Sequence, residues 1–367
     1  MTLPVPAPSG SESVVGLVRE SPWGTTPVTG VANPNKTIDG IIFVAMKEEN
    51  IQGNPNIDPQ TDDMSADREI QRIVDGGRIN QGTIRFTPGP ESIGYFLTAM
   101  FGTPDSSQLH SSSGTAEAVH QHTWYPGYQE RADWPVPYSI ESQISTLKSK
   151  LIQGALLRRM TLDLPNNAIM ATDLDIIAKR LVWLYPVADA ATHGSGTVDQ
   201  RGITRPAVMT AVPGLIDETG WHFKQLKAYP QIGNADAQSI TAMSWELQFL
   251  GLEGLFTGGS GRDIGTYRVD NFQLGGRATV IFEDEDLWEH IQDGAYFALD
   301  ATLEGDTLQA DHKNSLRIQA YSCKFNSADV PNRVGALEYD LPWTARKDPT
   351  EGFSTKITLI NSVSSYA

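Results

Sequence analysis

Hydrophobic and polar residues alternate along several short stretches of this 367-residue chain, and a period of two is typical of half-buried β-strands. The clearest stretch spans residues 241–249. Its apolar and polar residues fall on opposite faces: Met243, Trp245, Leu247 and Phe249 against Ser244, Glu246 and Gln248. Further strand candidates are residues 138–143, 160–164, 316–320, 337–343 and 356–360. The pattern predicts a mainly β protein.

A strand followed at once by a helix is predicted twice. Residues 82–86 alternate, and after a break at residues 88–91 an apolar stripe recurs at helical spacing up to Gly102. In the second half residues 276–282 alternate, and the acids at 284–286 are placed to cap a helix. The residues expected to form the buried apolar faces of the two helices are Ile93, Phe96, Leu97, Leu287, Trp288 and Ile291. Two copies of one element order predict a duplicated domain.

The chain is therefore divided into four segments. Residues 1–22, rich in Pro, Ser and Gly, are predicted to be an extended N-terminal arm, and residues 188–206 to be a linker. Residues 23–187 and 207–367 are predicted to be two β domains of the sandwich or barrel-forming kind, each with one flanking helix.

Long polar stretches interrupt the strands. Residues 47–80 are predicted to be a long loop with a short helix at 65–74, and this loop is either free on the surface or ordered against another subunit. Residues 103–123, rich in Ser, Gly and His, and the glycine-rich residues 251–265 are also predicted to be loops. Gly154 predicts a turn between two strands.

The charge balance limits the function. The formal net charge is −16, from 28 basic and 44 acidic residues, which argues against wrapping nucleic acid through phosphate contacts. A channel that DNA must pass through without binding would carry a negative charge, as this chain does. The N-terminal residues lack the regions of a signal peptide and no apolar run reaches transmembrane length, so we expect a soluble, unsecreted chain without a membrane partner.

Candidate chemical sites are weak. His110, His120 and His122 lie near one another in the sequence, but without a carboxylate or cysteine at matching spacing they are interpreted as loop histidines and not as metal ligands. Residues 258–263 resemble a phosphate-binding loop but lack its Lys-Ser/Thr ending. The single cysteine, Cys323, has no histidine partner by pattern. We therefore predict no catalytic residue, no metal, no cofactor and no enzyme activity.

These stretches together resemble the tail tube proteins (major tail proteins) of long-tailed bacteriophages, in particular the longer type with a duplicated tube domain. The residues that carry the resemblance are Ser21–Pro27, Gly82–Phe86, Pro90–Leu97, Met100–Gly102, His122–Tyr125, Met243–Phe249 and Phe282–Trp288. They span nearly the whole chain, and they mark where strands and helices begin and end without including a catalytic signature.

The resemblance implies rings of subunits that stack into a hollow, electronegative tube through which DNA passes without specific binding. A duplicated chain implies homotrimeric, pseudo-sixfold rings; if the second half is instead a decoration, the rings are hexameric. It also implies a place in the virion tail, assembly in the host cytoplasm, and as partners a tape measure protein and tail terminator or baseplate proteins. The long loop at 47–80 is implied to reach the adjacent ring.

Two sets of residues follow as candidates for assembly. Alternation places three acids on the polar face of their strands, where they are expected to face the lumen: Glu246, Glu338 and Asp340. The candidate ring-stacking residues are Asn54, Asp58, Asp62, Asp63, Arg68 and Glu69. The alternatives are another phage tail or baseplate ring protein, and a β-rich carbohydrate-binding or hydrolytic protein.

Overall fold

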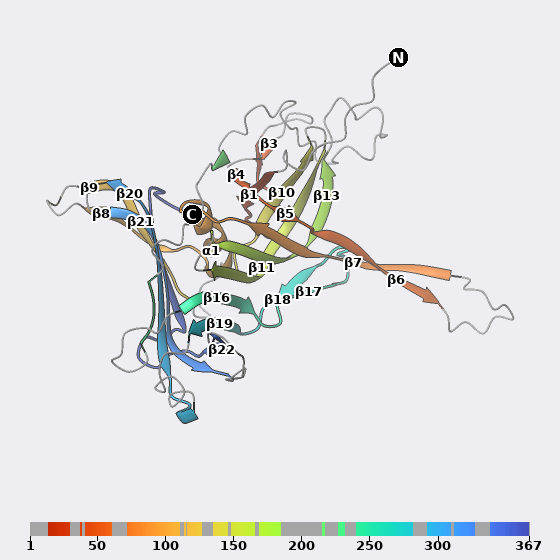
Figure 1. Ribbon diagram of the computed structural model, residues 1–367. Helices are drawn as coiled ribbons and strands as arrows, with labels where there is room; N and C mark the ends of the chain where they lie inside the picture. The colour runs from red at the N-terminus through yellow and green to blue at the C-terminus, as the bar shows by residue number, and fades with distance from the viewer. Residues whose placement is uncertain are drawn as a thin grey trace, which may run out of the picture.

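The computed structural model describes residues 14–29, 37–38, 41–60, 72–110, 114, 116–126, 135–145, 148–165, 169–184, 215–216, 227–231, 240–281, 292–309, 312–326 and 338–366. The predicted fold class is confirmed: these residues form a mainly β protein with large antiparallel sheets and one helix, α1 (Figure 1). The predicted linker at 188–206 and the residues expected to bury a second helix, Leu287, Trp288 and Ile291, lie outside the described residues.

The first outer sheet has the strand order β14–β4–β1–β10–β11–β13. Its strands are β1 (Val14–Arg19), β4 (Ile42–Ala45), β10 (Tyr138–Ser145), β11 (Lys148–Pro165), β13 (Arg180–Leu184) and β14 (Leu215–Ile216). The prediction of an extended arm over residues 1–22 is wrong for β1, which pairs on both edges and buries Val15 and Leu17. Their apolar alternation gives β1 a face that must be covered.

The shared sheet has the order β5–β7–β12–β11–β16–β19–β22. Its further strands are β5 (Glu48–Glu49), β7 (Arg72–Phe86), β12 (Ala171–Ala178), β16 (Ile240–Phe249), β19 (Phe272–Ile281) and β22 (Glu338–Ala345). We call it shared because β11, from the first half of the chain, pairs directly with β16, from the second.

β11 belongs to two sheets because its backbone bends at Gly154, where φ is +63°. The predicted turn at this glycine is therefore wrong, since the strand continues through it. A Cβ here would lie 2.7 Å from Nε1 of Trp23, which donates a hydrogen bond of 3.0 Å to the Gly154 carbonyl. Both the left-handed conformation and the close approach of the indole require glycine.

The second outer sheet has the order β15–β20–β21–β23–β9–β8. Its strands are β8 (Asp105–His110), β9 (Ala116–Trp124), β15 (Lys227–Gln231), β20 (Phe297–Gln309), β21 (His312–Phe325) and β23 (Thr355–Asn361). The prediction of a loop over 103–123 is wrong, since β8 and β9 form a hairpin there. In β9 the buried positions are first the odd-numbered Glu117 and Val119 and then the even-numbered His122 and Trp124. This shift by one residue hides the alternation in the sequence.

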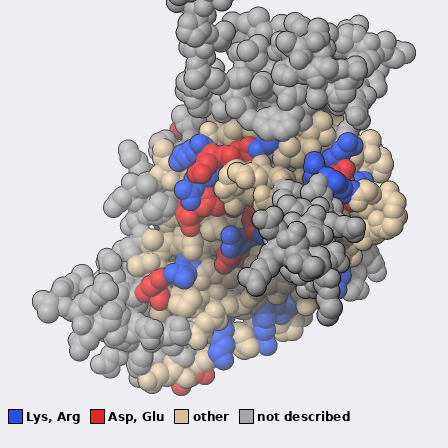
Figure 2. Space-filling view, turned by 90° about the vertical axis from the view of Figure 1, so that its right-hand side faces the viewer, with Lys and Arg blue, Asp and Glu red and all other residues tan. Residues whose placement is uncertain are grey.

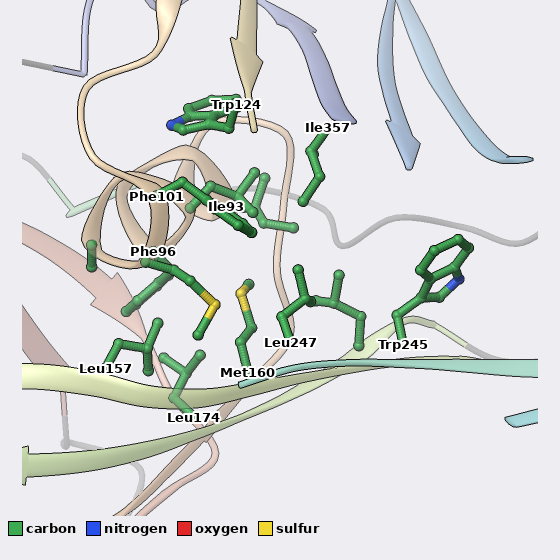
Figure 3. Close-up of a cluster of buried hydrophobic side chains, with 14 of the residues drawn as sticks. Ile93, Phe96, Phe101, Trp124, Leu157, Met160, Leu174, Trp245, Leu247 and Ile357 are labelled. Carbon is green, nitrogen blue, oxygen red and sulfur yellow. The ribbon is translucent and has the colours of Figure 1, made fainter. Parts of the chain in front are cut away.

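Helix α1 (Ser92–Phe101) covers the apolar face of the shared sheet and ends at Gly102. Ile93, Phe96 and Leu97 are all buried. Figure 3 shows the Phe96 side of the helix facing strands that carry Met160, Leu174 and Leu247, so one core joins β11, β12 and β16. The remaining strands are β2 (Val28–Thr29), β3 (Thr37–Ile38), β6 (Gln52–Gln60), β17 (Glu253–Leu255) and β18 (Thr266–Arg268).

One order of pairings occurs twice. β11 takes β10 on one edge and β13 and β12 on the other, and β12 pairs with β7. In the same way β21 takes β20 on one edge and β23 and β22 on the other, and β22 pairs with β19. We call these the first and second strand sets.

Candidate assembly surfaces

The polar face of the shared sheet is lined with cross-strand ion pairs. Arg85 donates two hydrogen bonds to Asp173, of 2.6 and 2.9 Å, in the bidentate geometry that guanidinium and carboxylate favour. These hydrogen bonds lower the pKa of Asp173. The other pairs on this face are Arg158–Asp175 at 2.7 Å, Arg159–Glu246 at 3.3 Å and Arg277–Asp340 at 3.4 Å.

Two of the three acids expected to face a lumen lie on this polar face. The side chains of Glu246 and Asp340 are 38% and 54% exposed, and each is bound to an arginine. Glu338 begins β22, and its side chain lies outside the described part of the chain. Asp163 lies on the same face; burial, reinforced by nearby Asp173, raises its pKa. The alternation identified the acids but gave no sign of the paired arginines.

The arginine pairs keep the polar face from presenting one sign of charge. Among its described side chains, four arginines (Arg85, Arg158, Arg159 and Arg277) lie with six carboxylates (Glu48, Asp163, Asp173, Asp175, Glu246 and Asp340). On the side of the molecule in Figure 2, basic and acidic side chains form small neighbouring groups, and neither sign makes a continuous patch. The net charge of −16 is thus not concentrated in one exposed acidic stripe there.

A β-hairpin arm extends from the body of the protein, where the sequence predicted a loop (Figure 1). It consists of β6 and the first part of β7, with Asn54 opposite Ile79 and Gln60 opposite Arg72. The prediction of a helix over 65–74 is wrong for residues 72–74, which begin β7. Of the candidate stacking residues, two lie in β6 and four fall outside the described residues: Asn54 and Asp58, and Asp62, Asp63, Arg68 and Glu69.

A buried ion pair fixes the root of the arm to the first outer sheet. Nζ of Lys150 lies 2.7 Å from Oε1 of Glu49, and the two side chains are 9% and 5% exposed. Glu49 also accepts a hydrogen bond from the Ser142 hydroxyl, and Lys150 donates a second one to the Ile51 carbonyl. With these hydrogen bonds the buried charges are compensated, which is the condition for such a pair to be tolerated. No pattern in the sequence predicts this pairing.

A second, short hairpin packs against the other side of the arm root. It consists of β17, where the prediction of a loop over 251–265 is wrong, and β18, which follows that stretch. The amide of Arg78 in β7 donates a 2.7 Å hydrogen bond to the Arg262 carbonyl, and the Phe256 ring lies so close to Gly77 that a Cβ there would be 2.3 Å from Cε1. Arg180 and Asp263 add an exposed ion pair at 3.3 Å. The second half of the chain thus supports the arm of the first.

His122 holds the C-terminal segment against α1. Because the Val363 carbonyl only accepts, Nε2–H of His122 donates to it at 2.8 Å, and Nδ1 accepts from the Ser106 hydroxyl at 2.8 Å. Burial lowers the pKa of His122. Tyr366 is buried beside this ring and donates a 2.9 Å hydrogen bond to the Glu91 carbonyl at the start of the helix. His122 is therefore a neutral structural group and not a solvated loop histidine, which corrects the prediction.

The other candidate chemical sites contain no reactive arrangement. Within the described ranges, no group of three or more His, Cys, Asp or Glu is placed to hold a metal ion. Cys323 is fully buried, and this burial raises the pKa of its thiol to about 12. No described helix is long and apolar enough to cross a membrane.

No curated protein sequence matches the chain significantly. The sequence profile of a family described as phage tail tube protein, however, matches residues 10–345, which is nearly the whole chain. The resemblance inferred from the sequence is confirmed. The chain belongs to the phage tail tube protein family and is a structural protein of the virion tail.

Proposed function

We propose that three copies of the chain close into a ring, and that these rings stack into the hollow tube through which phage DNA passes. The observation that carries this proposal is the pairing of β11 with β16. Residues 159–165 pair with residues 242–248 in one antiparallel register, so the two strand sets join edge to edge within one chain. A junction that forms inside the chain can form between chains if the same two edges are available.

Among the described residues, no strand pairs with the two corresponding edges at the ends of the shared sheet. The last residues of β21 pair with β22 and so extend the shared sheet by one strand. In the repeated order, this end of β21 corresponds to the part of β11 that pairs with β16, and β20 covers the same edge of β21 only as far as Cys323. At the other end of the sheet β5 pairs with β7, as β16 pairs with β19. Unpaired sheet edges favour strand addition. We infer that β5 of one chain adds to the end of β21 in the next.

This ring closure assigns a place in the tube to the polar face of the shared sheet and to the arm. The apolar face of the shared sheet is covered by α1 and the outer sheets, so its polar face, with Glu246 and Asp340, lines the lumen. The β6–β7 arm leaves the body of the protein and is the element that reaches the adjacent ring (Figure 1). Residues 23–187 and 207–367 act as the two tube domains.

Electron microscopy of the negatively stained full chain, with the particle mass measured on the same sample, tests this function. We expect rings or tubes with three 40.1 kDa chains per ring, about 120 kDa. Six chains per ring would keep the tube and refute the duplicated domain. Rings that never stack would favour a terminator or baseplate ring protein. A monomer that never assembles, at any concentration or salt, would refute both.

A further inference from the structure

We propose that the carboxylates of the polar face mask its arginines from DNA phosphates, so that DNA passes over an arginine-containing surface without being retained. This inference rests on the proposed function, because it takes the polar face as the lumen. An arginine binds phosphate with the same bidentate geometry that it uses for carboxylate. A lumen with free arginines would therefore hold the DNA that it has to release.

The arrangement of the ion pairs carries the inference. Asp173, Glu246 and Asp340 each bind an arginine of a neighbouring strand: Arg85, Arg159 and Arg277. A fourth arginine, Arg158, is bound to Asp175. Arg85 and Arg158 each use two donors in these contacts, and Arg159 and Arg277 use one, Nη1, so a carboxylate lies beside every guanidinium that a phosphate would approach.

Stability does not account for these pairs. The side chains of Arg85 and Arg277 are 53% and 69% exposed, and those of Asp173 and Asp340 are 34% and 54% exposed. Exposed ion pairs contribute little to the free energy of unfolding. Their main physical effect is on direct contacts, because a paired guanidinium has fewer donors open to a phosphate. At longer range the negative net charge of the protein already repels DNA.

The test compares two variants of equal net charge. The first, D173N/E246Q/D340N, removes a carboxylate from each of three pairs. The control, D293N/D306N/E351Q, changes three exposed acids away from the shared sheet. Both variants carry a formal charge of −13 in place of −16. Binding of a short fluorescein-labelled DNA duplex to each full-length protein is measured by fluorescence anisotropy between 50 and 200 mM salt, and melting temperatures verify that each variant is folded.

We expect no measurable binding by the wild-type protein or the control, and clear binding by the first variant. Three new phosphate contacts predict a slope of log K against log salt of about −2.7, which is about a 40-fold loss of affinity over this salt range. Adding R85Q/R159Q/R277Q to the first variant should abolish the binding. If the triple variant fails to fold, the single change D340N, at the most exposed pair, is measured instead.

The outcomes separate the inference from the function. DNA binding by the wild-type protein, equal binding by the control, or no binding by the folded first variant would overturn the masking. In any of these cases, tubes seen for the wild-type protein would leave the proposed function standing. Binding by the first variant alone, with no assembly of the wild-type chain, would show that the carboxylates mask the arginines but would refute the tube, and with it the role of the masking in DNA passage.

Discussion

The arm and the short hairpin occupy the same place in the two strand sets but are built differently. Each lies between a strand of the shared sheet and its partner: the arm between β5 and β7, the short hairpin between β16 and β19. The arm is anchored by the buried Glu49–Lys150 pair and projects from the body, whereas the short hairpin folds back onto Gly77 and Arg78. One excursion projects from the body and the other completes a contact within the chain.

The two strand sets therefore share an order of pairings, but this order does not determine what the segments between their strands contact. Both segments are polar or glycine-rich, and their composition predicted two loops. What separates them is that the short hairpin packs against another part of the chain, at Gly77 and Arg78, whereas the arm projects from the body. Four predictions test this comparison.

The largest expected effect comes from removing the arm. Replacing residues 56–77 by Asn-Gly closes a two-residue hairpin between Pro55 and Arg78, which are opposite each other in the register. If the arm connects rings, we expect folded rings that no longer form tubes in electron micrographs. The matched control deletes Gly258 and Gly259, at the tip of the short hairpin, and should leave tubes unchanged. Normal tubes from the arm variant would refute the stacking role.

The two hairpin roots should differ in free energy. Glu49→Ala leaves the buried Lys150 without its carboxylate and should lower the free energy of unfolding by about 3–5 kcal/mol. Asp263→Ala breaks the exposed pair with Arg180 and should cost at most about 1 kcal/mol. Urea denaturation measures both. The double change E49L/K150M should recover most of the loss, and equal costs for the two alanine variants would contradict the comparison.

Gly82 and Gly276 should respond alike if the strand sets are equivalent. A Cβ at Gly82 would lie 2.5 Å from Cα of Ile51, and one at Gly276 would lie 2.0 Å from the Ser244 carbonyl oxygen. Each alanine should cost about 1–3 kcal/mol, because a neighbouring backbone must move. Gly258 faces open space, so its alanine variant should stay within about 0.5 kcal/mol of the wild type in urea denaturation. A neutral change at either of the first two glycines would break the equivalence.

The smallest effect concerns His122, whose β8–β9 hairpin spans from the first strand set to β23 of the second. Its pKa is lowered from 6.5 in the folded protein, so below about pH 6.5 the unfolded chain binds a proton that the folded protein does not. Stability should therefore fall as the pH drops from 6.5 toward the folded pKa, and this term should not change above 6.5. Melting temperatures between pH 8 and 5 should show a smaller acid loss in His122→Gln than in the wild type.

The sequence by itself determined the strands that alternate and the first helix. Residues 241–249 and 82–86 carry apolar residues at a period of two, and burying that face is favourable wherever the strand is placed. Helix α1 follows for the same reason, from a period near 3.6. The family resemblance also came from these local patterns, because the glycines, prolines and capping acids that end strands and begin helices are local features of the sequence.

Only the tertiary structure decided the pairings between distant segments. The polar arm became a hairpin because backbone hydrogen bonds join residues 52–60 to 72–81, which needs no alternation of side chains. The β8–β9 hairpin became part of a sheet because β23 offered an edge. Glu49 and Lys150 are 101 residues apart in the sequence, and Arg85 and Asp173 are 88 residues apart. No local pattern encodes which charge meets which, since the fold alone brings these side chains together.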